Sequence, residues 1–93
     1  MSSAPQVSFD GDQAFERLVT SLYSAFEYNI GEIAVRGAAP VFDLDSARDT
    51  IAQMEMLLVK TYGNLTVSEN ALLTSYIEQA WKKFREKTRA EEQ

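Results

Sequence analysis

Carboxylates make up most of the side chains in this sequence that could do chemistry. Asp43, Asp45 and Asp49 fall within about a turn and a half of a predicted helix. Oxygen ligands for calcium must converge from several directions, and this spacing is not that of a calcium-binding loop. Glu55 flanks the apolar stripe of the same predicted helix, and we expect a Lys or Arg to pair with it. We therefore predict neither a metal site nor a cofactor.

Other catalytic chemistry lacks the residues it needs. The chain contains no histidine and no cysteine, so its serines and threonines have no partner of the usual kind to activate them. No nucleophile elbow, phosphate-binding glycine loop or dinucleotide-binding motif is present. Di-metal helical bundles normally use Glu-x-x-His pairs, which this chain cannot supply. We expect no catalytic residues and a protein that is not an enzyme.

Cations gather toward the C-terminus and alternate with the aromatic residues Trp81 and Phe84. Such a segment can lie on anionic lipid or follow a nucleic-acid backbone. In the simpler interpretation, cations favour a helix C-terminus and the two aromatics continue the core stripe. The net charge of −5 also argues against a nucleic-acid partner for the molecule as a whole. The residues of this predicted basic patch are Lys82, Lys83, Arg85, Lys87 and Arg89.

Helices must position all of these side chains. The chain has 93 residues, 45% of them hydrophobic, which is typical of one folded domain. Apolar residues recur at steps of three and four, and this spacing predicts an all-α fold with helices over about 13–33, 44–62 and 67–89. We expect residues 1–12 to be a flexible lead-in, with Asp12 as the N-cap. Residues 13–93 then form a single helical domain with a frayed C-terminus.

The boundaries of the second and third helices carry clear local signals. Asp43 is a good N-cap, and Gly63 suits the left-handed position that stops a helix. Thr66 and Glu69 have the spacing of a capping box, in which each side chain bonds the other residue's amide. Because the turn between Gly63 and Thr66 is short, the last two helices should form an antiparallel hairpin.

The apolar faces are wider than a small monomer can hide, since each covers about half of its helix. We therefore predict a homodimer or higher even oligomer, packed as a bundle, with parts of the first and third helices at the seam. Asn29 lies near the middle of an apolar face. It either bonds locally near the helix end or pairs with a second copy across the seam. The interaction candidates are Asn29, Tyr76, Trp81 and Phe84, with Met54 and Met56 adding apolar surface.

The segments 43–51, 54–57 and 60–66 resemble a small bacterial family known only as a domain of unknown function, numbered 1844. The specific part is the turn Lys-Thr-x-Gly-Asn-Leu-Thr, and the resemblance covers about residues 15–73. Tyr62 stands where family members usually carry Lys, and residues 75–84 depart from the family's Leu- and Arg-rich ending. The resemblance implies a helical fold and a bacterial, cytoplasmic setting, but no activity.

Together these features predict a small, acidic cytoplasmic protein. The longest apolar run, residues 56–59, is too short to span a bilayer, and the N-terminal residues do not resemble a signal peptide. We expect a non-enzymatic, oligomerising protein–protein interaction module, which binds its own copy or an unknown protein. The alternatives are a binder of nucleic acid or membrane through the basic C-terminal helix, and a helical bundle that binds a small ligand or metal.

Overall fold

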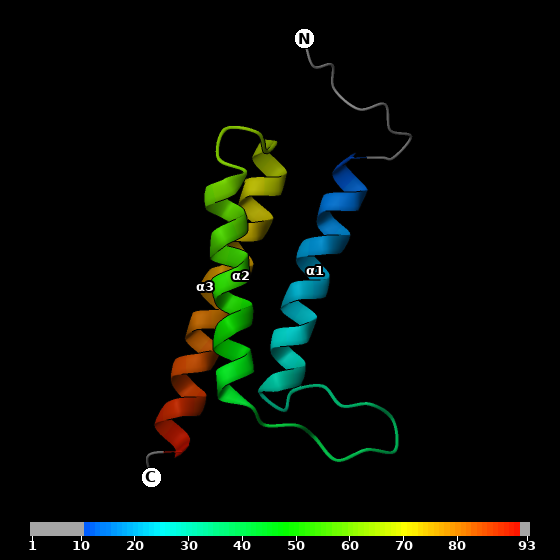
Figure 1. The fold of residues 1–93 in the computed structure, drawn as a ribbon, viewed down its shortest axis with the longest axis vertical. Helices are drawn as coiled ribbons and strands as arrows, with labels where there is room; N and C mark the ends of the chain where they lie inside the picture. The colour runs from blue at the N-terminus through cyan, green and yellow to red at the C-terminus, as the bar shows by residue number, and fades with distance from the viewer. Residues whose placement is uncertain (1–10, 92–93) are drawn as a thin grey trace.

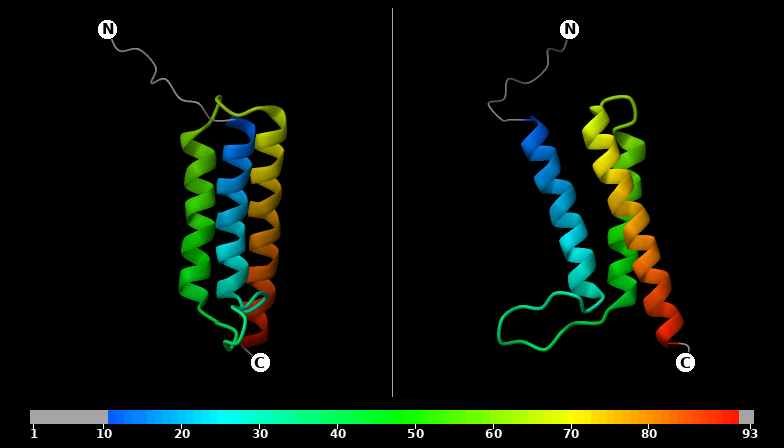
Figure 2. Two further views of the ribbon diagram at one scale, coloured as in Figure 1. Left: turned by 90° about the vertical axis from the view of Figure 1, so that its right-hand side faces the viewer. Right: turned by 180° about the vertical axis from the view of Figure 1, so that it is seen from behind.

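The computed structural model describes residues 11–91, and within this range it contains three helices and no strand. They are α1 (Gly11–Asn29), α2 (Leu44–Lys60) and α3 (Val67–Glu91). α2 and α3 form the predicted antiparallel hairpin, and α1 packs beside both (Figure 1). α1 approaches the hairpin most closely near its C-terminal end and leans away toward its N-terminus (Figure 2). The predicted all-α, three-helix fold is confirmed.

Local side-chain bonds fix both ends of the hairpin turn and the start of α2. Asp43 has an extended backbone, and its carboxylate accepts from the Ser46 amide at 3.0 Å and from the Ser46 hydroxyl at 2.8 Å. Thr66 accepts from the Glu69 amide at 3.1 Å, while the Glu69 carboxylate accepts from the Thr66 amide at 2.8 Å. Gly63 has φ of 83°. The predicted N-cap, capping box and left-handed glycine are therefore all present.

The first helix ends four residues earlier than the sequence pattern predicts. Gly31, with φ of 80°, forms a Schellman motif: its amide donates to the Tyr28 carbonyl at 3.2 Å, and the Glu32 amide donates to the Glu27 carbonyl at 2.9 Å. These bonds satisfy carbonyls that the next helical turn would have used. The apolar periodicity continues to Ile33, but that side chain is 44% exposed and lies outside the helix.

The other helix limits differ by smaller amounts. α1 begins at Gly11, so Asp12 is inside the helix rather than at the predicted N-cap position, and residues 1–10 of the predicted lead-in lie outside the described residues. α2 ends at Lys60, two residues early, because Thr61 leaves helical backbone geometry (φ −101°, ψ 8°) and the Tyr62 amide donates three residues back, to the Val59 carbonyl at 3.3 Å. α3 continues through Glu91, past the predicted end at residue 89.

The core is a set of apolar side chains that all three helices contribute at steps of three and four. Eight of them are at most 1% exposed, and most of these lie between α2 and the C-terminal half of α1. Thr50 is buried among them, and its hydroxyl donates to the Ser46 carbonyl at 2.9 Å. Among the described residues no buried side-chain nitrogen or oxygen lacks a partner. The eight side chains are Val19, Phe26, Ile30, Ala47, Ile51, Met54, Leu73 and Ala80, and Tyr23, at 7% exposure, is the ninth buried apolar residue.

Candidate interaction surfaces

A polar cluster joins α1 to α3. The Lys83 ammonium bonds Glu27 at 3.2 Å and Glu32 at 2.7 Å, and it lies 5.2 Å from the centroid of the Tyr23 ring. Burial alone would lower the pKa of Lys83, but its contacts with Glu32, Tyr23 and Glu27 outweigh burial and raise the pKa. The side chain is 28% exposed. Lys83 therefore serves this chain's own tertiary structure, and its charge is already compensated.

Two tyrosines extend this cluster along the α1–α3 contact. Tyr23 and Tyr76 stack with their ring centroids 4.5 Å apart and an interplanar angle of 17°. The Tyr76 hydroxyl lies 3.2 Å from the Thr20 hydroxyl, and the Tyr23 hydroxyl donates to Gln79 at 3.5 Å. Tyr76, an interaction candidate from sequence, thus has its ring and its hydroxyl engaged within the chain.

Trp81 and Phe84 lie at the contact between α2 and α3. The Trp81 indole N–H donates to the Glu55 carboxylate at 3.0 Å, and the Phe84 ring meets the Trp81 ring edge-on at 5.7 Å. The prediction that Glu55 pairs with a Lys or Arg is therefore wrong. An indole N–H takes that place because α3 brings Trp81, rather than a cation, alongside Glu55. Both aromatic rings are half-buried and pack against the core.

The five cations of the predicted basic patch do not form one surface. Lys83 points to α1, and Lys87 is half-buried. Lys82, Arg85 and Arg89 are exposed, and at 100° per residue they share one outward face of α3 with the acidic Glu78. Charges of both signs on that face weaken the attraction for a phosphate backbone.

The acids that could have bound a metal are spread apart. Between residues 11 and 91 no three acidic side chains come close enough to hold an ion. Asp49 accepts from Gln53 at 2.8 Å, and bonds from the Ser46 amide and hydroxyl lower the pKa of Asp43. These carboxylates therefore have roles within α2. No helix in the described range has a long enough apolar stretch to cross a bilayer.

α1 carries a second stripe beside the one that enters the core. We define the α1 outer stripe as Phe15, Leu18, Leu22, Ala25 and Asn29, which recur at steps of three and four. Leu18 is 49% exposed and Ala25 is exposed, while the other three are half-buried. At 100° per residue, the stripe lies roughly opposite the side of α1 that carries Thr20 and Glu27 toward α3. The stripe therefore lies on the flank of α1 toward α2, where Phe15 and Leu22 pack against the core, and Leu18 and Ala25 are its exposed members.

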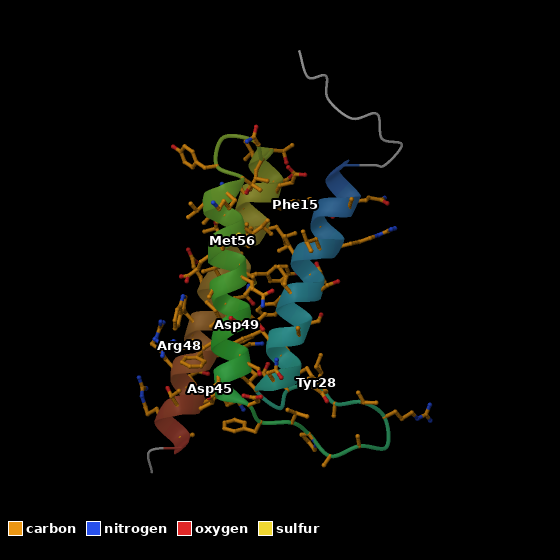
Figure 3. All side chains as sticks on the ribbon, in the orientation of Figure 1. Phe15, Tyr28, Asp45, Arg48, Asp49 and Met56 are labelled. Atoms are coloured by element: carbon orange, nitrogen blue, oxygen red, sulfur yellow. The ribbon has the colours of Figure 1, made fainter. Side chains whose placement is uncertain are left out.

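Asn29 ends this stripe with an amide that the chain leaves unused. Its backbone carbonyl accepts from the Asp43 amide at 2.7 Å, but its side chain has no hydrogen-bond partner between residues 11 and 91. The predicted local side-chain bond near the helix end is therefore not formed within this range. The neighbours of the stripe on its outer edge are uncharged: Ala14, Ser21 and Tyr28. Phe15 and Tyr28 mark the two ends of this part of α1 in Figure 3.

The hairpin tip, defined as residues 59–67, carries the most exposed apolar side chains in the described range. Val59 is 72% exposed, Tyr62 85% and Val67 90%. Tyr62, Leu65, Val67 and Asn70 line a shallow depression of about 430 Å³ beside the turn. Val59 lies within α2 but 100° around the helix from the half-buried Leu58, outside the face that carries Ile51 and Met54 into the core.

These features define a class of protein: a small all-α bundle of three helices, with a tightly capped hairpin and with apolar side chains exposed on α1 and at the hairpin tip. The model of the family described as a domain of unknown function (DUF1844) matches residues 12–86, and the chain belongs to this family. The match extends through Trp81 and Phe84, beyond the segment that shows the resemblance by eye. No curated protein and no solved structure matches the chain.

Proposed function

We propose that this protein is a non-enzymatic interaction module that binds protein surfaces and associates with its own copy. The observation that carries this proposal is the amount of large apolar side chain left outside the core. Leu18, Tyr62 and Val67 are each about half exposed or more, although the same chain buries nine other apolar side chains to an exposure of 7% or less. Apolar area that water covers in the monomer contributes about 25 cal/mol per Å² when a partner covers it.

The arrangement of this surface favours association over a chance scatter of exposed residues. Leu18 and Ala25 are exposed on the same flank of α1, and the hairpin tip concentrates three exposed apolar residues within nine positions of the chain. Isolated exposed apolar residues are ordinary on proteins, but contiguous patches are typical of interfaces. Residues 61–68 carry no charged side chain, and depletion of charge around an exposed aromatic residue such as Tyr62 is also typical of the centre of an interface.

Sedimentation velocity of the full chain at micromolar concentration tests the proposal. We expect a species of twice the monomer mass of 10.5 kDa, with a fraction that falls on dilution. A single 10.5 kDa species at every concentration would contradict self-association. Repeating the run in high salt separates apolar association from a charge-driven one, because salt screens only the latter.

A further inference from the structure

We infer that a second copy docks on the side of the α2–α3 hairpin that points away from α1, so that α2 of each copy packs against α3 of the other. The two hairpin turns then lie at the same end of the dimer. This inference rests on the proposed self-association and adds to it the surface, the orientation and the contacts that select that orientation.

The hairpin has one side that α1 leaves open. α1 packs against the opposite side of α2 and α3 (Figure 2). On α3, Tyr76 and Lys83 contact α1, and the exposed residues lie roughly opposite them at 100° per residue. On α2, the exposed residues lie roughly opposite the buried Ala47 and Met54. We call this open side of the two helices the outer face.

The half of the outer face nearest the turn is apolar. Met56 is 51% exposed and Val59 72%, and they lie within about 60° of each other around α2. Val67 is 90% exposed, and the exposed Ala71 follows it one turn later on α3. A partner that covers this half removes large apolar side chains from water, which stabilises the complex.

The other half of the outer face carries opposite charges on its two helices. α2 presents two acids one turn apart, and α3 presents three cations at steps of three and four, all of them exposed. No ion pair within residues 11–91 uses any of these five side chains. They are Asp45 and Asp49 on α2, and Lys82, Arg85 and Arg89 on α3.

The bond from Trp81 to Glu55 places the acids and the cations at the same end of the hairpin. Because the helices are antiparallel, the part of α3 that follows Trp81 lies beside the part of α2 that precedes Glu55. Arg48 lies seven residues before Glu55, on the side of α2 toward α3 and outside the arc that carries the two acids. Glu78, three residues before Trp81, lies at the boundary between the apolar and the charged half of α3.

The two halves together select one arrangement of a two-fold dimer. A two-fold axis parallel to the helices places α2 of each copy opposite α3 of the other and keeps the two turns level. The apolar halves then meet each other, and Asp45 and Asp49 of each copy meet the cations of the other copy. Each helix of the seam is antiparallel to the helix that it faces, as in a four-helix bundle.

An axis perpendicular to the helices gives a poorer match. It puts the turns at opposite ends, so α3 of one copy runs along α3 of the other in the reverse direction. The cations would then cover Val67 and Ala71, which supply no acceptor for a desolvated charge. The chain has a net charge of −5, so two copies repel each other in orientations that pair no acid with a cation.

Charge reversal on each helix, followed by mixing, tests the arrangement. The first variant is Asp45→Lys with Asp49→Lys, and the second is Lys82→Glu with Arg85→Glu. Each variant alone brings like charges together at both seams, so its dissociation constant at low salt should rise at least about tenfold. An equimolar mixture pairs opposite charges at both seams again and should restore association to within about threefold of the natural chain.

Arg17→Glu with Arg36→Glu is the matched control for the second variant. It makes the same change in net charge at two exposed positions outside the hairpin, and it should associate within about threefold of the natural chain. Circular dichroism checks that every variant remains folded. Sedimentation of each protein and of the mixture gives the dissociation constants.

Thiol cross-linking gives a second test that leaves the charges unchanged, because the natural chain has no cysteine. Val59→Cys and Ala71→Cys, made in separate chains and then mixed, should be joined by a short bis-maleimide, since the inferred seam places α2 of one copy against α3 of the other. Each of these variants by itself is the control and should link much less. Ala52→Cys, near the middle of α2, should link to its own copy only if the axis is perpendicular to the helices.

The outcomes separate this inference from the proposed function. A dimer that neither charge reversal weakens, or that mixing does not restore, overturns the arrangement and leaves self-association standing. Efficient linking of Ala52→Cys to itself, without a link between residues 59 and 71, shows the perpendicular axis and also overturns it. A natural chain that is monomeric in every measurement overturns both the inference and the proposed self-association.

Discussion

The indole N–H of Trp81 donates to a carboxylate oxygen of Glu55 at 3.0 Å and so joins α3 to α2 across 26 positions of the chain. The Phe84 ring supports the indole edge-on from the next turn of α3. This contact replaces the ion pair that the sequence suggested for Glu55. It also fixes which part of α2 lies beside the C-terminal half of α3.

Removing the acceptor of this bond should weaken the hairpin. We expect Glu55→Ala to lower the free energy of unfolding by about 0.5–1.5 kcal/mol, the usual range for a hydrogen bond. Glu55→Gln keeps an acceptor oxygen and should lower the free energy of unfolding by a smaller amount. The chain has one tryptophan, so urea unfolding followed by its fluorescence reports directly on this contact. Glu78→Ala, at an exposed position of α3, is the control, and an equal loss there would contradict a specific role for Glu55.

Lys83→Met should destabilise the protein more than loss of a typical surface ion pair does. Exposed pairs contribute about 0–1 kcal/mol, but here the change also leaves Glu27 and Glu32 without the cation between them. We expect a loss of about 1–2 kcal/mol in thermal or urea unfolding at neutral pH. Lys82→Met removes the neighbouring, exposed cation and should change stability by no more than about 0.5 kcal/mol.

The pH dependence of this difference follows from the raised pKa of Lys83. A raised pKa means that the folded state favours the charged lysine, so the stabilisation is complete below the ordinary value of 10.5 and is lost only as pH rises through the higher folded value. Between neutral pH and about 9, the gap between natural chain and Lys83→Met should therefore stay constant. If the difference in stability between the two proteins shrinks between neutral pH and about 9, the charged form of Lys83 is not what stabilises the fold.

The two methionines of α2 should respond very differently to truncation. Met54 is fully buried in the core, whereas Met56 is 51% exposed. Met54→Ala should lower the free energy of unfolding by about 2–5 kcal/mol, because it removes buried apolar contacts and leaves a cavity. Met56→Ala should remain within about 0.5 kcal/mol of the natural chain. Similar losses at both positions in urea unfolding would show that the helix faces are assigned incorrectly.

Asp43 should make the start of α2 sensitive to acid. Bonds from Ser46 lower the pKa of Asp43 below its ordinary value of 3.8, so the folded state favours the carboxylate. Its contribution is present above 3.8 and is lost as pH falls through the lower folded pKa. Asp43→Asn still accepts from the helix amides but does not titrate. In acid denaturation, the difference in free energy of unfolding between the natural chain and this variant should be constant above pH 3.8. It should fall as the pH drops below 3.8, where the natural Asp43 takes up a proton.

The parts of the fold that were predictable from sequence depend on residues close together in the chain. Asp43 with Ser46, and Thr66 with Glu69, act across three positions, and Gly63 needs only its own backbone conformation. The end of α1 depends on an equally local signal, Gly31, but the apolar spacing through Ile33 outweighed it in the prediction. The sequence does carry a signal for this helix end: Gly31 is followed by a connector that contains Gly37 and Pro40.

The parts that were not predictable depend on how separate helices pack. Lys83 belongs to the basic segment by sequence, and only the approach of α1 to α3 brings it to Glu27 and Glu32, 56 and 51 positions away. The same approach stacks Tyr23 on Tyr76. Sequence periodicity shows that a side chain lies on an apolar face, but it does not show which neighbouring helix covers that face. For this reason it identified Asn29 as unusual without showing that its side chain has no partner among residues 11–91.

The bond from the Asp43 amide to the Asn29 carbonyl has a consequence for how this family can vary. This bond joins the two ends of the segment 30–42. It therefore holds the C-terminal end of α1 beside the N-terminal end of α2. Residues 32–40 are all exposed, and a side chain at Gly37 would meet no atom within 4 Å. Lengthening a loop whose ends are already joined adds little entropy cost, about 0.6 kcal/mol for each doubling. Relatives can thus insert sequence here, and an engineer can graft a reporter at this site, without redesigning the bundle.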